Sequence, residues 1–502
     1  MLPFLPMDVI KHWIDNEAVD GGERNGDVFN PATGEKTAKV VYATREDVDR
    51  AVASAKKALE SWGKTSLAKR TRILFAFREL VERNKDTIAR MLTLEHGKVL
   101  SDAAGEVQRG LEVIEFACGI AELSKGEFSE NVSTEVDSYS IRQPVGVCAG
   151  ITPFNFPVMV PMWMYPIAIA CGNTFILKPS EKDPSVTNYC ARLFQEAGLP
   201  DGVLNVVHGD KVAVDRLLEH PDVAAISFVG STPIAKYIYE TGTRNGKRVQ
   251  ALGGAKNHMV VLPDADMDLA ADAAVSAGYG SAGERCMAIS VLVTVGDAAG
   301  KLLPKMRERM ASLKVGPGID PTSEMGPLVT KQHLDKVTSY VEKGVSEGAK
   351  LVTDGRTLKV SGHEKGFFLG PTLFDDVRPE MVIYQEEIFG PVLSVMRVPT
   401  YTDAVKLIHE HVYANGVALF TNDGGAARKF QSDIQVGMVG INVPIPVPMA
   451  YYSFGGWKSS IFGDLHIYGR DGVRFYTRNK VIIARWPDPR FRGVNLGFPQ
   501  NT

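Results

Sequence analysis

The feature that most constrains the fold of this chain is an uncharged segment at residues 143–177. A segment of this length can in principle cross a bilayer as one helix. Prolines interrupt it, namely Pro144, Pro153, Pro157, Pro161 and Pro166. Each proline removes a backbone donor and disturbs helix geometry, so a continuous spanning helix is excluded. We therefore expect a buried strand, a tight loop and a core helix within a soluble protein.

Short apolar strands alternate with helices on both sides of that segment. Thr44 and Asp47 are spaced as in a capping box and precede apolar residues at helical spacing, and a longer helical stretch covers 67–94. Strands are expected at 145–151, 174–177, 204–207 and 225–229. This alternation predicts the α/β fold class, with a doubly wound and mostly parallel sheet.

A second series of strands and helices runs from about 259 to 443, with helices at 265–278 and 331–348. It predicts a second α/β domain. Two segments fit neither series, because residues 129–143 alternate like a hairpin and residues 473–483 follow the last helices. We expect these two segments to pair with each other or across subunits.

The composition excludes several classes of protein. Among 502 residues, 56 Lys and Arg stand against 59 Asp and Glu, so the chain has no basic surplus for nucleic acid. The five cysteines form no CxxC pair, which argues against zinc ribbons and redox pairs and fits a cytoplasmic protein without a metal. Residues 1–10 show neither a basic leader nor a cleavage site, so no targeting peptide is expected.

Cys286 lies in the stretch GERCM, between a glycine-flanked turn and an apolar run. A thiol becomes a strong nucleophile when its pKa is lowered and it is partly exposed, and the neighbouring Arg285 favours that state. A buried structural cysteine is an equally good interpretation of this stretch alone.

Asn155 lies in TPFNFP, a proline-framed loop after a strand. A rigid loop of this kind could aim the amide at a developing oxyanion. Taken alone, the loop favours an asparagine that satisfies turn backbone instead.

Three further motifs suit a dinucleotide. KPSE at 178–181 ends a strand and opens a helix, which places Lys178 and Glu181 at the carboxyl edge of the sheet, where ligands of open α/β sheets bind. FVGSTP at 228–233 runs from a strand into a helix whose N-terminus could face a phosphate, although a merely capped helix is the more ordinary interpretation. EEIFGP at 386–391 offers a carboxylate and an aromatic wall, or a solvated loop.

The order of these motifs, together with ALGGAKNH, resembles the aldehyde dehydrogenase superfamily over nearly the whole chain. The motifs TPFNFP, ALGGAKNH and GERCM and the ending FGDLHIYGRDGVRFYTR are most similar to the branch that oxidises methylmalonate or malonate semialdehyde and acylates coenzyme A. The resemblance implies a Rossmann-like NAD domain at 1–124 and 145–253, an α/β catalytic domain at 254–450, and a β oligomerisation arm at 125–144 and 470–490. It also implies a homodimer or homotetramer.

The resemblance further implies roles for individual residues. Cys286 is the nucleophile, Asn155 is the oxyanion donor, and Arg109 and Arg285 bind the substrate carboxylate with their paired donors. The residues implied to bind NAD are Thr152, Phe154, Lys178, Glu181, Gly230, Ser231, Leu252, Gly253, Glu387 and Phe389. Without the resemblance, Arg109 would be assigned to a solvated helix face, paired with Glu106 or Glu112.

Two positions depart from the superfamily pattern. Ala235 replaces a glycine and still permits close helix packing. Ala251 stands where the superfamily has the glutamate that activates water to hydrolyse the thioester, and a methyl group cannot accept a proton. A thioester on Cys286 is therefore expected to wait for a thiol such as coenzyme A.

These expectations combine into one reaction. The aldehyde is oxidised with NAD, a Cys286 thioester forms, and CoA removes propionyl or acetyl with release of CO2 and NADH. Three alternatives stay open: a hydrolytic enzyme that uses Glu387 or Asp464 as its base, an acylating enzyme for another semialdehyde such as succinate semialdehyde, and a non-redox protein that retains the scaffold. The sequence leaves open valine or inositol breakdown as the pathway.

Overall fold

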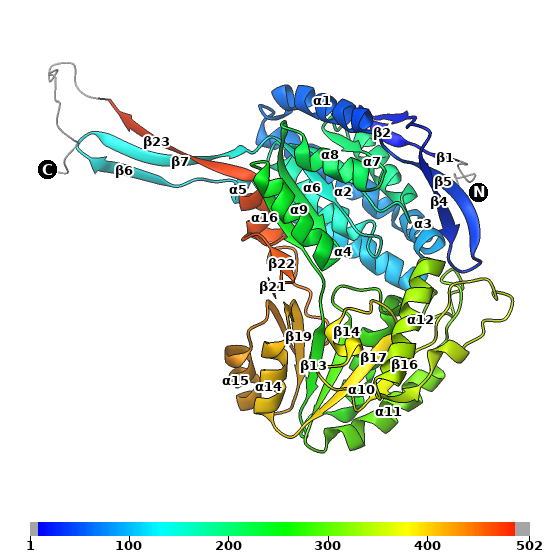
Figure 1. Cartoon of the computed structure of the whole chain (residues 1–502). Coiled ribbons are helices and arrows are strands. Elements are labelled where there is room, and N and C mark those ends of the chain that lie inside the picture. Colours follow the sequence, from blue (N-terminus) through cyan, green and yellow to red (C-terminus); the bar gives the residue numbers. More distant parts are fainter. Residues whose placement is uncertain (1–8, 487–502) are drawn as a thin grey trace.

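The structure, a computed structural model, describes residues 9–486 and contains two large sheets and a projecting arm (Figure 1). Two predictions lie partly outside these residues. They are the absence of a targeting peptide, which concerns residues 1–8, and the end of the oligomerisation arm at 487–490. No helix among residues 9–486 is long and apolar enough to cross a membrane.

The first sheet has eight strands, and its five central strands are parallel. Their order is β12 (Arg248–Leu252), β11 (Val223–Val229), β8 (Val147–Ile151), β9 (Thr174–Lys178) and β10 (Leu204–Val206). Antiparallel strands complete both edges, β22 (Ile461–Phe462) beside β12, and β2 (His12–Ile14) with β3 (Glu17–Val19) beside β10. The four strands expected from the sequence are confirmed within two residues.

Helices cover both faces of this sheet because its strands are apolar on both sides. On β8, Val147 and Ala149 face one hydrophobic cluster and Cys148 faces the other. The helices of one face are α1 (Arg45–Trp62), α8 (Lys211–Glu219) and α9 (Thr232–Arg244). Those of the other are α2 (Leu67–Arg83), α3 (Lys85–His96), α4 (Leu100–Cys118), α6 (Met159–Ala170) and α7 (Ser185–Glu196).

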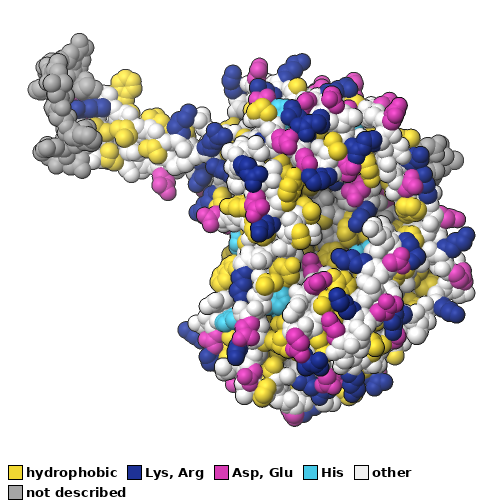
Figure 2. Space-filling model, viewed as in Figure 1, with side chains coloured by type: hydrophobic (Ala, Val, Ile, Leu, Met, Phe, Trp, Pro, Cys, Tyr) yellow, Lys and Arg dark blue, Asp and Glu magenta, His cyan; other side chains and the backbone are white. Residues whose placement is uncertain are grey.

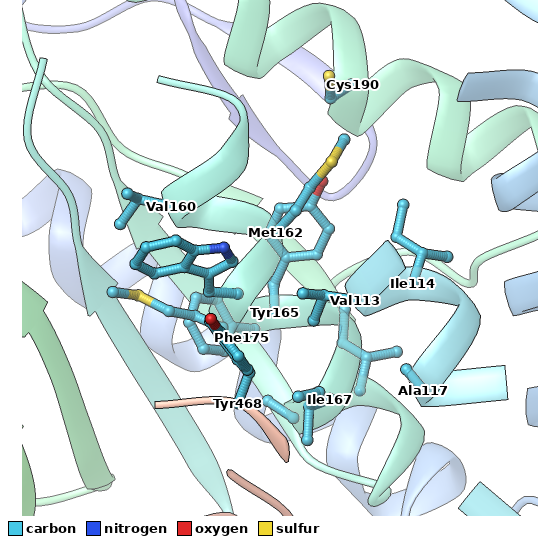
Figure 3. Close-up of a cluster of buried hydrophobic side chains, with 14 of the residues drawn as sticks. Val113, Ile114, Ala117, Val160, Met162, Tyr165, Ile167, Phe175, Cys190 and Tyr468 are labelled. Atoms are coloured by element: carbon cyan, nitrogen blue, oxygen red, sulfur yellow. The ribbon is translucent and has the colours of Figure 1, made fainter. Parts of the chain in front are cut away.

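The uncharged segment forms β8, a loop, α6 and β9, as expected. Every residue of α6 is buried, and Figure 3 shows Met162, Tyr165 and Ile167 of this helix packed with Val113 and Ile114 of α4. A Cβ at Gly110 of α4 would lie 2.6 Å from the Met162 Sδ, so glycine lets the two helices approach closely without displacing that side chain.

The second sheet has seven strands in the order β15 (Lys350–Thr353), β16 (Thr372–Asp375), β17 (Val392–Val398), β14 (Ile289–Val295), β13 (Asn257–Val261), β19 (Gly416–Phe420) and β20 (Met438–Ile441). All pairs are parallel except β15 with β16. Its helices are α10 (Met267–Tyr279), α11 (Ala298–Ser312), α12 (Lys331–Ser346), α14 (Tyr401–Glu410) and α15 (Gly424–Asp433). The second strand–helix series is thereby confirmed.

The arm is a three-stranded antiparallel sheet of β6 (Phe128–Ser133), β7 (Val136–Pro144) and β23 (Thr477–Arg485), which projects away from the body (Figure 1). The expected pairing of the two unassigned segments with each other is confirmed, since β23 pairs with β7 from Thr477 opposite Pro144 to Arg485 opposite Val136. Apolar side chains gather on the arm in Figure 2, and the exposed ones are Phe128, Val132, Ile141, Val481, Ile483 and Trp486. A separate sheet of β1 (Val9–Ile10), β5 (Glu35–Val41) and β4 (Asn25–Asn30) lies near the N-terminus.

Two helix boundaries differ from expectation. The helical stretch at 67–94 divides into α2 and α3 at Asn84, whose amide donates to the Leu80 carbonyl and ends the first helix. The segment after β9 does not open a helix at once, because α7 begins only at Ser185, after Pro184. Glu181 therefore lies in a bend rather than in a first helical turn.

Candidate active site

A cavity of about 600 Å³ lies between the two large sheets. The first sheet contributes loops at the carboxyl ends of β8, β9, β11 and β12, and this group, which we call the first wall, contains Pro153, Phe154, Asn155, Lys182, Val229, Gly230, Ser231, Gly253 and Gly254. The second sheet contributes the second wall, made of Cys286, Thr330, Gln332, His333, Lys336, Glu387 and Phe389. The cavity thus brings Cys286 and Asn155 together.

A left-handed turn aims Cys286 at the cavity. Ser281, Ala282 and Gly283 all have positive φ, between 51° and 73°. Gly283 could not be replaced without strain, because a Cβ there would overlap the Gly390 carbonyl. Two such non-glycine residues in succession are costly, and strain of this kind is typical of functional sites.

The backbone of Cys286 is held by two amides. Asn257 Nδ2 donates to the Cys286 carbonyl at 2.9 Å, and Asn415 Nδ2 donates to it at 3.2 Å. These two hydrogen bonds fix the orientation of the Cys286 carbonyl. They thereby restrict the backbone that carries the thiol.

The surroundings of the Cys286 thiol favour its neutral form. Burial, together with the nearby Glu387 carboxylate, raises the pKa of Cys286 to about 12, although the backbone N–H groups of Cys286 and Met287 and the Arg285 guanidinium act in the opposite direction. The expectation of a lowered pKa is therefore wrong for this state, because desolvation outweighs the neighbouring positive charge.

Glu387 lines the cavity and accepts a hydrogen bond from the Ala255 N–H at 3.0 Å. Burial raises the pKa of its carboxyl to about 7, against the opposing effects of that N–H and of Lys256. A carboxyl with this pKa can both release and accept a proton near neutral pH.

Asn155 is buried in the loop after β8, as expected. Its carbonyl accepts a hydrogen bond of 2.7 Å from Lys98 Nζ. This hydrogen bond fixes the backbone at Asn155, and the residue itself lines the cavity.

Two aromatic rings form one end of the cavity. Phe154 and Phe389 meet edge to face, with centroids 5.8 Å apart. Phe389 has φ of 62°, and its carbonyl accepts a hydrogen bond of 2.7 Å from His333 Nε2. Lys182 Nζ lies 4.2 Å from the Phe154 centroid, a cation–π distance.

The residues expected to bind NAD divide into two groups. Phe154, Gly230, Ser231, Gly253, Glu387 and Phe389 line the cavity. Lys178, Glu181, Thr152 and Leu252 do not line it but lie at or just beyond the carboxyl ends of β8, β9 and β12. Lys178 Nζ donates to Glu181 Oε2 at 3.3 Å.

Ser231 is the N-cap residue of α9, yet its hydroxyl makes no hydrogen bond to the helix. Pro233 follows in the first turn and has no N–H to satisfy. The first N–H groups of α9 and the Ser231 hydroxyl are therefore free for an anionic ligand at this edge of the cavity.

The two arginines expected to bind a carboxylate are already paired. Arg285 Nη2 donates to Asp102 Oδ1 at 2.7 Å. Arg109 Nη1 donates to Glu112 Oε2 at 2.6 Å, and its Nη2 donates to the Pro448 carbonyl at 2.6 Å. Of the expected partners of Arg109, Glu112 is confirmed, whereas Glu106 is buried and paired with Lys98.

The two bases considered for hydrolysis differ in position. Glu387 shares the cavity with Cys286, whereas Asp464 is exposed and does not line it. Ala251 is fully buried in β12, two residues before Gly253 of the first wall.

Sequence reasoning missed several residues of the site. Thr330, Gln332, His333 and Lys336 come from the first turns of α12, whose sequence resembles any amphipathic surface helix. Glu284, which lies behind the cavity lining and accepts a hydrogen bond from the Val329 N–H, escaped prediction because charged residues in turns are ordinarily exposed, whereas it is fully buried and that burial raises its pKa to about 8.

Comparison with known proteins gives a consistent set of relatives. A model described as the aldehyde dehydrogenase family matches residues 18–482. A malonate-semialdehyde dehydrogenase of Pseudomonas aeruginosa is 59% identical over 482 residues, which cover 96% of this chain and 97% of that protein.

Solved structures agree. The crystal structure of a methylmalonate-semialdehyde dehydrogenase from Oceanimonas doudoroffii has a TM-score of 0.95 and 57% identity, and the match covers 97% of this chain and 100% of that one. A Sinorhizobium meliloti structure, provisionally named for the same activity and solved with NAD, has a TM-score of 0.95 and 56% identity, with 96% and 98% coverage.

Proposed function

This chain belongs to the aldehyde dehydrogenase family, and from that premise we propose that it oxidises malonate or methylmalonate semialdehyde with NAD and transfers the acyl group to coenzyme A. The observation that carries the proposal is the meeting of Cys286 and Asn155 in one cavity, with an alanine at position 251. An aldehyde needs a nucleophile and an oxyanion donor, and the thioester that results needs a second nucleophile.

Residues of the first wall, of the segment at the end of β9 and of the second wall together fit a dinucleotide. The unused Ser231 hydroxyl and the open N-terminus of α9 suit a pyrophosphate, and Lys178 with Glu181 suit the adenosine ribose. Glu387 and Phe389 suit the nicotinamide ribose and ring. NAD, when bound, supplies the acceptor for the hydride that the aldehyde carbon loses. On this assignment, residues 1–124 and 145–253 form the cofactor-binding domain and residues 254–450 the catalytic domain.

Cys286 loses its thiol proton to solvent and adds to the aldehyde carbon as a thiolate. The backbone N–H groups of Cys286 and Met287 stabilise the thiolate, and the Asn155 amide with the Cys286 N–H then holds the alkoxide. When the carbon loses its hydride, the C=O bond re-forms and the acyl group remains on Cys286 as a thioester.

The fate of the thioester depends on position 251. Ala251 offers no base for water, so the sulfur of coenzyme A attacks the carbonyl and Cys286 leaves. With a malonyl or methylmalonyl group, loss of CO2 generates an enolate that the same oxyanion donors stabilise and that takes up a proton from solvent, so the products are acetyl-CoA or propionyl-CoA.

We assign the substrate carboxylate to Arg109 and Arg285. Each arginine spends some donors on protein partners, Arg285 on Asp102 and Arg109 on Glu112 and Pro448. Arg285 retains Nε and Nη1, and Arg109, which also contacts Met449 and Val447, retains Nε for charge-assisted hydrogen bonds with a carboxylate.

Replacement of the nucleophile tests the proposal. Cys286→Ala is expected to abolish NADH formation from malonate semialdehyde while leaving thermal unfolding unchanged. A variant of Cys190, a free cysteine buried in α7 away from the cavity, serves as the control. Sustained NADH formation by Cys286→Ala would reject the mechanism, and no NADH formation by the unaltered chain would favour the non-redox role instead.

One observation favours a second candidate, a hydrolytic aldehyde dehydrogenase. Glu387 lies in the same cavity as Cys286 and has a pKa raised by burial to about 7, which suits a general base. Product analysis with and without coenzyme A separates the two, because a hydrolytic enzyme releases the free acid in both cases.

The exposed apolar side chains of the arm support a homodimer or homotetramer, since a strip of this kind on a projecting sheet suits burial against another subunit. Light scattering of the full chain measures the assembly, and a monomer at micromolar concentration would reject it. The five free cysteines support a location in the cytoplasm.

A further inference from the structure

Helix α4 carries two carboxylates one turn apart, Asp102 and Glu106. Residues four positions apart lie on the same face of a helix. Neither carboxylate faces the cavity, yet each is bonded to one of the two loops that supply the reacting groups.

Glu106 is bonded to the loop of Asn155 at two points. Its Oε1 accepts hydrogen bonds from the backbone N–H of Val158 at 2.8 Å and of Met159 at 3.1 Å. Its Oε2 accepts a hydrogen bond of 2.6 Å from Lys98 Nζ, and the same ammonium donates to the Asn155 carbonyl at 2.7 Å. The ion pair thus holds the loop at Asn155 itself and at the start of α6, which follows it.

The ion pair is wholly buried, since both side chains have no exposed surface. A buried pair of charges contributes little to stability, because its desolvation cost offsets the attraction, and apolar replacements are often neutral. Lys98 Nζ also lies 4.3 Å from the Phe156 ring centroid, so the loop surrounds the ammonium. Packing alone does not require a charge at this place.

Asp102 is bonded to the other loop. Its Oδ1 accepts the hydrogen bond from Arg285 Nη2, and Arg285 directly precedes Cys286. The Arg285 guanidinium also fills the space beside Gly280, where a Cβ would lie 2.5 Å from Nη1. Asp102 therefore fixes the residue adjacent to the nucleophile.

The helix that carries both carboxylates is itself firmly placed. Gly110 allows α4 to approach α6 closely at Met162, and Val113, Ile114 and Ala117 pack in the core shown in Figure 3. A displacement of α4 would therefore require repacking of the core.

We propose that Asp102 and the Lys98–Glu106 pair are positioning residues, through which α4 sets the placement of Asn155 relative to Cys286. The proposal rests on the proposed roles of these two catalytic residues. Effective catalysis requires the donor and the nucleophile to be held within a fraction of an ångström, and a shared rigid support for both loops provides this.

A mutant cycle tests the action of the pair through Asn155. The variants are Asn155→Ala, the neutral replacement Lys98→Met with Glu106→Gln, and all three changes together. The neutral replacement removes both charges at once, so no buried charge is left unpaired and the fold is retained. The readout is the single-turnover rate of NADH formation with propanal, which has no carboxylate for the arginines.

Asn155→Ala is expected to slow the single turnover by about 10²–10³-fold. The neutral replacement alone is expected to slow it by about 10–100-fold, with the KM for NAD unchanged within about twofold. The three changes together are expected to be no slower than Asn155→Ala by more than about threefold, because the pair acts only through that amide. Multiplied losses, or a full rate in the neutral replacement, would overturn the proposal.

Asp102→Asn is an independent test that leaves the buried Lys98–Glu106 pair intact. We expect the rate of Cys286 alkylation by iodoacetamide to change by at least about threefold, since Arg285 loses its ionic partner. Unchanged alkylation and unchanged turnover would reject the role of Asp102. Glu115→Gln is the matched control, because Glu115 lies on the same helix and pairs with Arg78 at the surface, 2.9 Å away.

The Cys286→Ala variant distinguishes failure of the proposed function from failure of the positioning role alone. If it still forms NADH, the proposed function fails whatever the cycle shows. If it is inactive and the cycle losses multiply, only the positioning role of α4 fails.

Discussion

The two walls of the cavity differ in how their charges are satisfied. The first wall is held by a buried ion pair, in which Lys98 bonds both Glu106 and the Asn155 carbonyl and opposes the rise that burial causes in the pKa of Glu106. The second wall carries groups whose burial favours the neutral form, since the pKa of Cys286 is raised to about 12 and that of Glu387 to about 7. The first wall thus suits fixed orientation, and the second suits transfer of protons and acyl groups.

Within one cavity, the first wall therefore orients a donor, and the second wall carries the groups that react. Donors aimed at an oxyanion are effective only when they are fixed before the reaction. A base must instead change its protonation state during the reaction, so a pKa near the working pH, such as that of Glu387, matters more for it. The following predictions test this division, from the largest expected effect to the smallest.

Asn155→Ala removes the fixed donor of the first wall. We expect kcat to fall by about 10²–10³-fold, because the alkoxide loses a preorganised hydrogen bond. The measurement is steady-state NADH formation, with Asn245→Ala, an exposed amide at the end of α9, as the control. A loss confined to KM would show that Asn155 binds the aldehyde rather than its oxyanion.

Arg109→Ala removes one of the two guanidinium groups assigned to the substrate carboxylate. We expect the KM for malonate semialdehyde to rise by about 10–100-fold, because a charge-assisted pair with the carboxylate is lost. The KM for propanal should change by less than about twofold. Similar changes for both aldehydes would assign Arg109 to loop support through the Pro448 carbonyl instead.

Ala251→Glu adds a base where the chain has a methyl group. We expect turnover in the absence of coenzyme A to rise by at least about tenfold, because the carboxylate can deprotonate an attacking water. Ala251→Gln has nearly the same volume and no base, so it should show no gain. A gain that is equal in both variants would point to altered packing around β12.

Glu387→Gln neutralises the carboxylate beside the thiol. Since its negative charge raises the pKa of Cys286, removal should lower that pKa and increase the thiolate fraction at any given pH. We expect alkylation of the unliganded chain by iodoacetamide at pH 8 to accelerate about threefold or more. Glu386→Gln, which alters an exposed carboxylate bonded to Tyr340, is the control, and equal rates in the two variants would contradict the coupling.

The sequence predicted the elements well where local signals are strong. The strands of the first sheet are apolar runs bounded by glycine and proline, and the Thr44 capping box begins α1 as expected. The break at Asn84 escaped prediction because the helical periodicity continues on both sides of it.

Less of the site could be predicted. Motif order brought Cys286, Asn155 and Glu387 together correctly. The raised pKa of the thiol could not be foreseen, because it depends on burial by residues distant in the sequence. Lys98 and Glu106 lie only eight positions apart, yet their link to Asn155 crosses 57 positions and leaves no local pattern.

The most direct test of the account follows NADH formation from malonate semialdehyde with and without coenzyme A, together with the intact mass of the protein. Without coenzyme A, we expect about one NADH per active site, then a stop, with an acyl group attached at Cys286. Coenzyme A should then release that group and restore continuous turnover. Many turnovers without coenzyme A, with free acid as the product and no adduct on Cys286, would contradict the account.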